Sequence, residues 1–192
     1  LHRLIGRAVM VDLRQKASND SDYQASVEDF EEWEEQHGPI PEGAVVIMDF
    51  GWASKYKNAT EYFGTPFTNN TELYHFPGLS GAGAQWLAET GKVFGVGTDT
   101  ASIDYGQTKD FKAHKVLSAH NIYNLEHLAL PPTPLPPSGY QLLSLPIKIR
   151  HGTGGPVRVV ALPYAASSAT LTSPLVTLIY FCTACLLLFV KH

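Results

Sequence analysis

The stretch GAVVIMDFGW, residues 43–52, is an apolar run of strand length with a glycine near each end. It shows no alternation of polar and apolar residues, so a strand built from it must be covered on both faces. We therefore predict that it forms a central strand in a sheet with packing on both sides.

A helix-to-strand unit is predicted in residues 76–100, FPGLSGAGAQWLAETGKVFGVGTDT. Ser80 is a suitable N-cap, Gly91 is a suitable end of the helix, and the strand ends at Asp99. Such units are typical of α/β folds, in which ligands bind beyond the carboxyl ends of the strands. The polar residues 98–104, TDTASID, are expected at that edge.

The other predicted elements fit the same α/β class. Residues 6–14 are a short β-rich run, followed by a polar loop to about residue 25, and residues 26–38 have the capping and apolar stripe of an amphipathic helix. Farther along we predict a helix over 110–120, a strand over 121–128, a proline-rich connection over 130–139, and two strands from YQLLSLPIKIR and GPVRVVALP.

Length and charge limit the possible functions. The chain has 192 residues, of which 44% are hydrophobic and 17% charged, enough for one domain with a sizeable core. A net charge of -4 without a Lys/Arg run argues against a nucleic-acid partner. Since the chain begins with Leu1 and lacks a signal-peptide pattern, we expect an N-terminally incomplete domain over residues 1–164 of a longer protein.

The C-terminal segment is hydrophobic. Residues 174–192, PLVTLIYFCTACLLLFVKH, carry no charge before Lys191, and residues 165–173 form a small-residue linker. This arrangement favours a glycolipid-anchor signal, with a plain membrane anchor or a buried core helix as alternatives. Cys182 and Cys185 both lie in this tail, so no disulfide is expected in the folded part.

Three Asn-x-Ser/Thr sequons, at Asn19, Asn58 and Asn69, agree with an anchored protein. They lie in polar, turn-rich stretches, where a glycan can sit on the surface. We expect these sites to be glycosylated and the protein to face the cell exterior, held to the membrane by its C-terminal tail.

Residues 113–128, AHKVLSAHNIYNLEHL, contain three histidines and a glutamate, residue types that bind divalent metals. In one continuous helix, His114 and Glu126 would lie about 120° apart and could not share a metal. The sequence instead favours helix, turn and strand, because a β-favouring pair follows Asn121. A helix folded back onto its strand can bring His114 and Glu126 together, while His127 points to the opposite face from Glu126.

The remaining histidines give weaker signals. A single His is more often a surface or satisfied core residue than a ligand, so His120 and His127 are interpreted as bystanders. His75 precedes a Pro-Gly turn and either lines a pocket or packs at the surface. Residues 151–156, HGTGGP, lack the lysine and helix of a phosphate-binding loop and predict a hairpin turn. No serine stands in a Gly-x-Ser-x-Gly elbow, so a serine hydrolase is not supported.

The ordered set EGAVVIMDFGW, HFPGLS, GVGTDTASID, KDFKAH and GTGGPVRVVALP, together with the His-to-Glu spacing of twelve, resembles the cyclase family of metal-dependent hydrolases. This family includes kynurenine formamidase and isatin hydrolase, and the likeness covers about residues 4–163. It implies an α/β fold of mixed β-sheets with flanking helices, one or two zinc or manganese ions, a small-molecule amide substrate and a homo-oligomer.

The resemblance also implies roles for single residues. His114 and Glu126 fall on ligands of the second metal in the two-metal members. Asp99, Ser102 and Asp104 would border the site and, with His75, are the candidates for substrate binding.

The chain departs from the family in one respect. The main metal motif, His-x-Gly-Thr-His-x-Asp, normally precedes the segment IGRAVMVDL, and this chain begins just after that place. Two ligands fall short of the three that a catalytic zinc usually has. Residues 1–192 alone are therefore expected to show little activity, and the catalytic residues stay unassigned.

Two functions are open on this basis. The first is a metal-dependent amidohydrolase in the full-length protein, of the type that converts N-formylkynurenine to kynurenine in tryptophan catabolism. The second is a non-catalytic cell-surface module that keeps the fold for binding. The presence or absence of the upstream metal motif distinguishes them.

Overall fold

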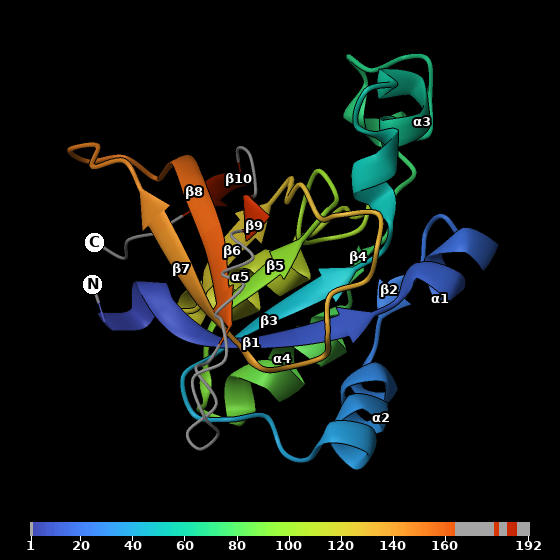
Figure 1. The fold of residues 1–192 in the computed structure, drawn as a ribbon. Helices are drawn as coiled ribbons and strands as arrows, with labels where there is room; N and C mark the ends of the chain where they lie inside the picture. The colour runs from blue at the N-terminus through green and yellow to red at the C-terminus, as the bar shows by residue number, and fades with distance from the viewer. Residues whose placement is uncertain (1, 164–178, 181–183, 188–192) are drawn as a thin grey trace.

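The computed structural model describes residues 2–163, 179–180 and 184–187 (Figure 1). The helices are α1 (Arg14–Asn19), α2 (Val27–His37), α3 (Ala59–Phe63), α4 (Gly81–Glu89) and α5 (Lys112–Ala119). The strands are β1 (Ile5–Asp12), β2 (Gln24–Ala25), β3 (Ala44–Asp49), β4 (Gly78–Leu79), β5 (Val93–Thr98), β6 (Tyr123–Glu126), β7 (Tyr140–Pro146), β8 (Gly154–Pro163), β9 (Ile179–Tyr180) and β10 (Ala184–Leu187). Short 3-10 turns cover His2–Leu4, Trp52–Lys55 and Thr71–Leu73.

One curled, mixed sheet dominates the molecule, with the strand order β10-β6-β5-β3-β1-β7-β8-β9. Neighbours from β6 to β1 are parallel, whereas β7 and β8 run antiparallel. Because β10 pairs with both β6 and β8, the sheet curves round on itself. A separate small sheet joins β2 to β4. The predicted mixed α/β fold is confirmed.

Strand β3 lies at the centre of the sheet, as its apolar run predicts. It pairs in parallel with β1 on one side and β5 on the other, and all six of its residues are buried. Its side chains alternate between two cores. Val46 and Met48 pack with the helices, whereas Val45 and Ile47 face the inside of the curl.

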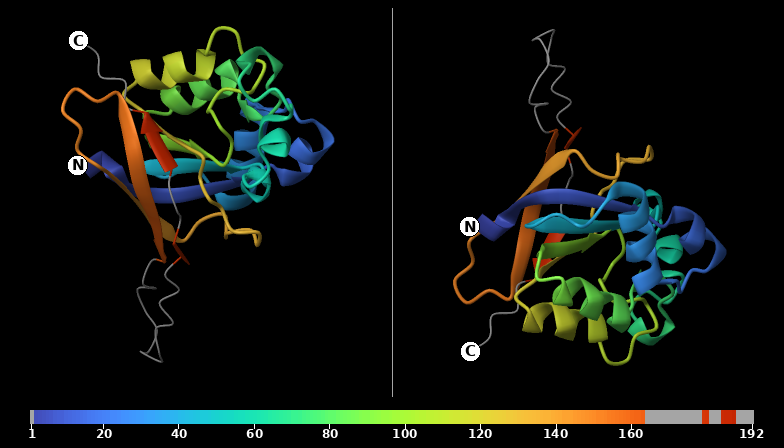
Figure 2. Two further views of the ribbon diagram at one scale, coloured as in Figure 1. Left: turned by 90° about the horizontal axis from the view of Figure 1, so that it is seen from above. Right: turned by 90° about the horizontal axis from the view of Figure 1, so that it is seen from below.

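The helices and strands are arranged in layers on the two sides of the central strands (Figure 2). Helices α4 and α5 cover one face of the central strands, and β7 and β8 cross the other face. Helix α2 joins the helical layer through Phe30, which stacks on Trp86 of α4 with ring centroids 5.9 Å apart. Both faces of the sheet are therefore covered, which explains why β3 carries no polar face.

Several local predictions agree with the structure. Ser26 and Asp29 form a capping box at the start of α2, where the sequence predicts a capped helix over residues 26–38, and the side chain of Ser80 caps α4 by accepting from Gly83 N–H. The loop expected up to residue 25 contains the helix α1, which the sequence analysis missed. Helix α1 has six residues, too few for a clear apolar period.

Only two short pieces of the predicted tail 174–192 fall within the described residues, and both are strands, β9 and β10. The rest of the tail and the whole linker 165–173 lie outside the described residues, so the anchor stays a prediction. Among the helices that the structure describes, none combines the length and hydrophobicity needed to cross a membrane.

Candidate functional site

A buried group of three side chains forms where α5, β6 and the loop after β5 meet. His114 Nδ1 lies 2.6 Å from Asp104 Oδ2, and His114 Nε2 lies 3.2 Å from Glu126 Oε1. All three residues are less than 10% exposed. The imidazole therefore lies between two carboxylates and is largely shielded from bulk water.

The predicted helix, turn and strand bring this group together. His114 lies in the first turn of α5, and Glu126 is the last residue of β6. The turn between them contains Asn121, whose φ of 57° lies in the left-handed region that asparagine tolerates. The chain reverses there, so residues twelve apart in sequence become neighbours.

Asp104 positions both the helix and the histidine. Its carboxylate accepts hydrogen bonds from the backbone N–H groups of Ala113 and His114, so it caps the start of α5 from a distant loop. The same carboxylate faces His114 Nδ1. The family resemblance implies a substrate contact for Asp104, and in the structure both of its carboxylate oxygens are engaged by α5.

The loop that carries Asp104 is held by the segment HFPGLS. Leu79 N–H donates to the Ile103 carbonyl, and Gly106 N–H donates to the Phe76 carbonyl. Gly78 lies so close to this loop that an added Cβ would stand 2.3 Å from the backbone nitrogen of Tyr105. Only glycine fits there, which accounts for one residue of the motif.

The electrostatics of the group favour a charged imidazole in the protein without metal. Burial by itself would lower the pKa of His114, but the hydrogen bonds and negative charges of Asp104 and Glu126 outweigh it and raise the pKa to about 9. Glu126 Oε1 also accepts from Ile103 N–H, which fixes its carboxylate.

The same geometry suits two ligands of a metal. A metal-binding histidine commonly donates its second ring N–H to a carboxylate, as Nδ1 is placed to do with Asp104, and Nε2 then faces the ion. Glu126 would supply an oxygen beside it. Within the described part of the chain, no group of three or more His, Cys, Asp or Glu side chains is arranged to hold a metal. The residues fit half of a metal site.

His127 directly follows Glu126 and lies in an unusual place. Its φ is 56°, its ring stacks near Tyr62 with centroids 5.7 Å apart, and its Nδ1 lies 2.8 Å from the Tyr62 hydroxyl. This position differs from the bystander role that the sequence predicts for His127. The sequence does not predict a positive φ at His127, because neither a glycine nor a turn motif occurs at this position.

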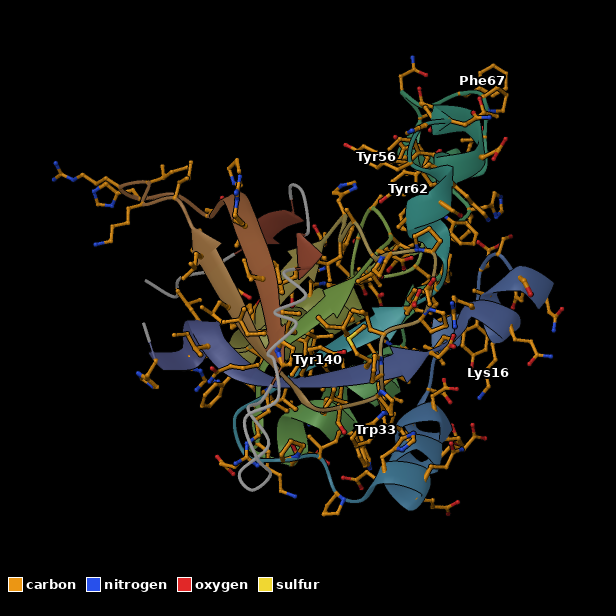
Figure 3. All side chains as sticks on the ribbon, in the orientation of Figure 1. Lys16, Trp33, Tyr56, Tyr62, Phe67 and Tyr140 are labelled. Atoms are coloured by element: carbon orange, nitrogen blue, oxygen red, sulfur yellow. The ribbon has the colours of Figure 1, made fainter. Side chains whose placement is uncertain are left out.

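Two cavities adjoin the His127 ring. One, of about 140 Å³, is lined by Tyr56, Tyr62 and Asp99 among others. The second, of about 440 Å³, is lined by several aromatic side chains and by Ser102. Tyr56 and Tyr62 come from the α3 region, which stands away from the sheet (Figure 3).

Asp99 is buried beneath the smaller cavity. Its carboxylate oxygens accept hydrogen bonds from the backbone N–H groups of Phe50 and Ala53, so the side chain anchors the loop after β3. Burial raises the pKa of Asp99 to about 7, against the opposing effect of these hydrogen bonds. A substrate contact by Asp99 stays a prediction.

The other candidate residues are scattered. His75 Nδ1 pairs with Asp22 at 2.7 Å, and His75 lines neither cavity beside His127. His120 is exposed and its Nδ1 lies 2.8 Å from the Val116 carbonyl. Ser102 borders the larger cavity, where its predicted role remains open.

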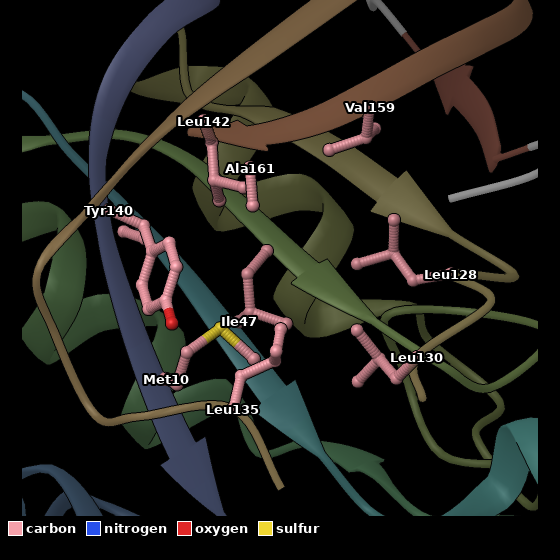
Figure 4. A pocket seen from close by; sticks show the side chains of 10 residues that line it. Met10, Ile47, Leu128, Leu130, Leu135, Tyr140, Leu142, Val159 and Ala161 are labelled. Carbon is pink, nitrogen blue, oxygen red and sulfur yellow. The ribbon is translucent and has the colours of Figure 1, made fainter. Parts of the chain in front are cut away.

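A further pocket lies inside the curl of the sheet (Figure 4). Its lining includes Met10, Ile47, Leu128 and Leu142, together with other apolar side chains and Tyr140. No acid, base or metal-binding residue contributes to it, so this space belongs to the core.

The curled mixed sheet carries the buried Asp–His–Glu group at the carboxyl end of its parallel strands, the edge where α/β proteins bind ligands. The model of the putative cyclase family matches residues 1–105, more than half of the chain. The chain therefore belongs to the cyclase family.

Two named relatives are consistent with membership of the cyclase family. Isatin hydrolase of Roseibium aggregatum is 29% identical over 166 residues, which are 84% of this chain and 61% of that protein. Kynurenine formamidase of Salinibacter ruber is 46% identical over 74 residues, 38% of this chain and 34% of that protein. The chain thus spans less than two thirds of the length of these relatives.

Solved structures show the same fold. Isatin hydrolase A from Labrenzia aggregata, bound to benzyl benzoate, matches with a TM-score of 0.75 and 31% identity, covering 83% of this chain and 61% of that one. A crystal structure described as a novel cyclase has a TM-score of 0.60 and 15% identity, over 82% of this chain and 53% of that one, and supports the fold alone.

Proposed function

We propose that the protein is a metal-dependent hydrolase of small amides, arylformamidase-like in its substrate class. The observation that carries this proposal is the buried group of Asp104, His114 and Glu126 in a chain of the cyclase family. The relatives named isatin hydrolase and kynurenine formamidase support the reaction class.

In this proposal the chain supplies two ligands to a zinc or manganese ion. Asp104 holds Nδ1 of His114 so that Nε2 faces Glu126, and Ile103 N–H holds one oxygen of Glu126. The bound ion would polarise the amide carbonyl and lower the pKa of a water molecule. Two ligands are fewer than catalytic zinc usually has, so the remaining ligands would come from outside the described residues, in the upstream metal motif that the family resemblance implies.

The experiment compares two proteins made from the gene: residues 1–192, and the protein extended upstream through the family's metal motif. Only the extended protein should hydrolyse N-formylkynurenine or isatin with added Zn²⁺ or Mn²⁺. Glu126→Gln in the extended protein should lower kcat/KM at least tenfold. Robust hydrolysis by residues 1–192 would contradict the proposed division of the site. A metal-loaded extended protein without activity would favour the binding module instead.

We also propose that the protein is displayed outside the cell. Asn19, Asn58 and Asn69 are all exposed, as glycan attachment requires. An N-glycosidase should lower the apparent mass of the protein expressed in eukaryotic cells, and a phosphatidylinositol-specific phospholipase should release it. Retention on the membrane after the phospholipase treatment would favour a spanning tail, and secretion without treatment would argue against either anchor.

A further inference from the structure

The hydrogen bonds around Tyr62 determine where the His127 proton lies. The Tyr62 hydroxyl is 3.1 Å from the backbone carbonyl of Asp99 and 2.8 Å from His127 Nδ1. A carbonyl oxygen only accepts, so the single hydroxyl hydrogen of Tyr62 is directed to Asp99. Nδ1 of His127 must then carry a proton and donate it to the Tyr62 oxygen.

The opposite arrangement is less favourable. If Tyr62 donated to His127 Nδ1, two oxygen acceptors would face each other at 3.1 Å in a place where Tyr62 is only 2% exposed. Among the described residues, Tyr62 is the hydrogen-bond donor to the Asp99 carbonyl. Leaving a buried acceptor without a donor costs more than an ordinary hydrogen bond contributes.

The backbone holds the His127 ring in this position. His127 N–H donates to the Thr100 carbonyl, and Leu128 N–H donates to the Thr98 carbonyl. These bonds keep His127 at its positive φ, a conformation that carries strain in residues other than glycine. Strained residues of this kind often occur at binding sites, where the surrounding structure fixes a side chain for use.

The second ring nitrogen is available to a ligand. No residue that the structure describes makes a hydrogen bond with Nε2 of His127, and the ring lines both cavities. We infer that Tyr62 fixes His127 in the Nδ1–H tautomer, so that Nε2 accepts a hydrogen bond from an N–H group of the bound amide. His127 is thus a positioning and specificity residue that acts beside Glu126.

This inference deepens the proposed function, because the ligand it assumes is the small amide substrate. Its test, however, needs neither a metal nor hydrolysis. The tautomer and the ligand contact of His127 can therefore be determined even if the hydrolase proposal fails.

The tautomer is measured first. Residues 1–192 with ¹⁵N-labelled histidine are studied at pH 8 by long-range ¹H–¹⁵N correlation, which distinguishes protonated from unprotonated ring nitrogens. We expect His127 to have a protonated Nδ1 and an unprotonated Nε2. In Tyr62→Phe the Nε2–H form should become populated. The control Tyr56→Phe should change nothing, because Tyr56 meets the ring only edge-on at 6.2 Å. An Nε2–H tautomer in the unmodified chain would overturn the inference.

The ligand contact is measured with two probes, isatin and N-methylisatin, which differ in one N–H group. Isatin should bind about fivefold more tightly, the value of one ordinary hydrogen bond, and should shift the Nε2 resonance. In His127→Asn the preference should disappear. Asparagine tolerates the positive φ and can still donate to Tyr62, so the variant should fold normally. Equal binding of the two probes, binding of neither, or a preference that persists in His127→Asn would overturn the proposed contact.

Discussion

Single side chains in this protein serve more than one partner. The Asp104 carboxylate caps α5 and orients His114, and the Glu126 carboxylate accepts from Ile103 N–H while facing His114. Because each group is already fixed by the backbone, little reorganisation is needed for His114 and Glu126 to meet a common ligand. The orientation of the site therefore depends on residues that need not touch the ligand.

Replacing Asp104 by asparagine should weaken metal binding by the protein extended upstream through the metal motif. An amide cannot accept all three hydrogen bonds that Ala113 and His114 donate, so the ring loses its fixed orientation. We expect Zn²⁺ or Mn²⁺ affinity, measured by competition with a chromophoric chelator, to fall roughly 10- to 100-fold. Asp110→Asn is the matched control, since Asp110 is exposed and pairs only distantly with Lys112. Equal effects of the two substitutions would argue against a special role for Asp104.

Asp99 should make stability depend on pH. Its pKa is about 7 in the folded protein and 3.8 without burial, so the folded state keeps the Asp99 proton up to a higher pH than the unfolded state does. The contribution of Asp99 to the free energy of unfolding is therefore complete below pH 3.8 and is lost as the pH rises through 7.

The comparison that isolates this effect uses Asp99→Asn, which cannot ionise. Urea unfolding between pH 4 and 8 should show that the variant gains stability relative to the unmodified chain as the pH rises. A constant difference over that range would mean that Asp99 keeps an ordinary pKa.

At the scale of elements, short contacts between backbone segments hold the site. The segment of β4 lies directly against residues 103–105, and Gly78 permits that approach. The Asp104 carboxylate caps the start of α5, and parallel pairing with β5 holds β6 in position. A displacement of β4 would therefore also move His114, through the loop that carries Asp104.

Gly78→Ala should therefore destabilise the fold and the site together. The new Cβ would stand 2.3 to 2.7 Å from three backbone atoms of residues 103–105, which cannot move aside as a flexible side chain can. We expect a loss of about 1–3 kcal/mol in unfolding free energy and weaker metal binding. Gly155→Ala is the control, because the nearest atom there is the end of the Ile149 side chain at 3.2 Å. Equal stabilities of the two variants would contradict this account.

At the scale of the molecule, the connection from β7 to β8 projects from the sheet (Figure 1). The end of β7 and this connection together expose Leu145, Ile147 and Ile149, each at least half accessible. Apolar side chains grouped on a projecting hairpin favour contact with another chain. We propose that a second copy of the protein covers them, in line with the homo-oligomer expected from the family resemblance.

The double substitution Ile147→Glu and Ile149→Glu should lower the association state. The introduced charges would be buried at the contact without partners, which disfavours it strongly. Light scattering after size-exclusion chromatography should show a dimer or larger oligomer for residues 1–192 and a monomer for the variant. Lys148→Glu, between the two sites, serves as the control for added negative charge. A monomeric unmodified chain would remove the basis for the proposal.

The sequence by itself determined the central elements of the protein. The run of residues 43–52 predicted β3, Ser26 and Ser80 predicted the starts of α2 and α4, and the break at Asn121 predicted the reversal between α5 and β6. These features depend on local hydrophobic periodicity and capping, which the sequence contains directly.

Only the tertiary structure decided which side chains meet. That Asp104 would hold His114, and that Tyr62 would hold His127, depends on contacts between residues 10 and 65 positions apart in the chain. No periodicity encodes such distances, because they arise when the sheet curls and its loops pack together. The sequence therefore identified His114 and Glu126 as a pair, and the fold supplied the neighbours that orient them.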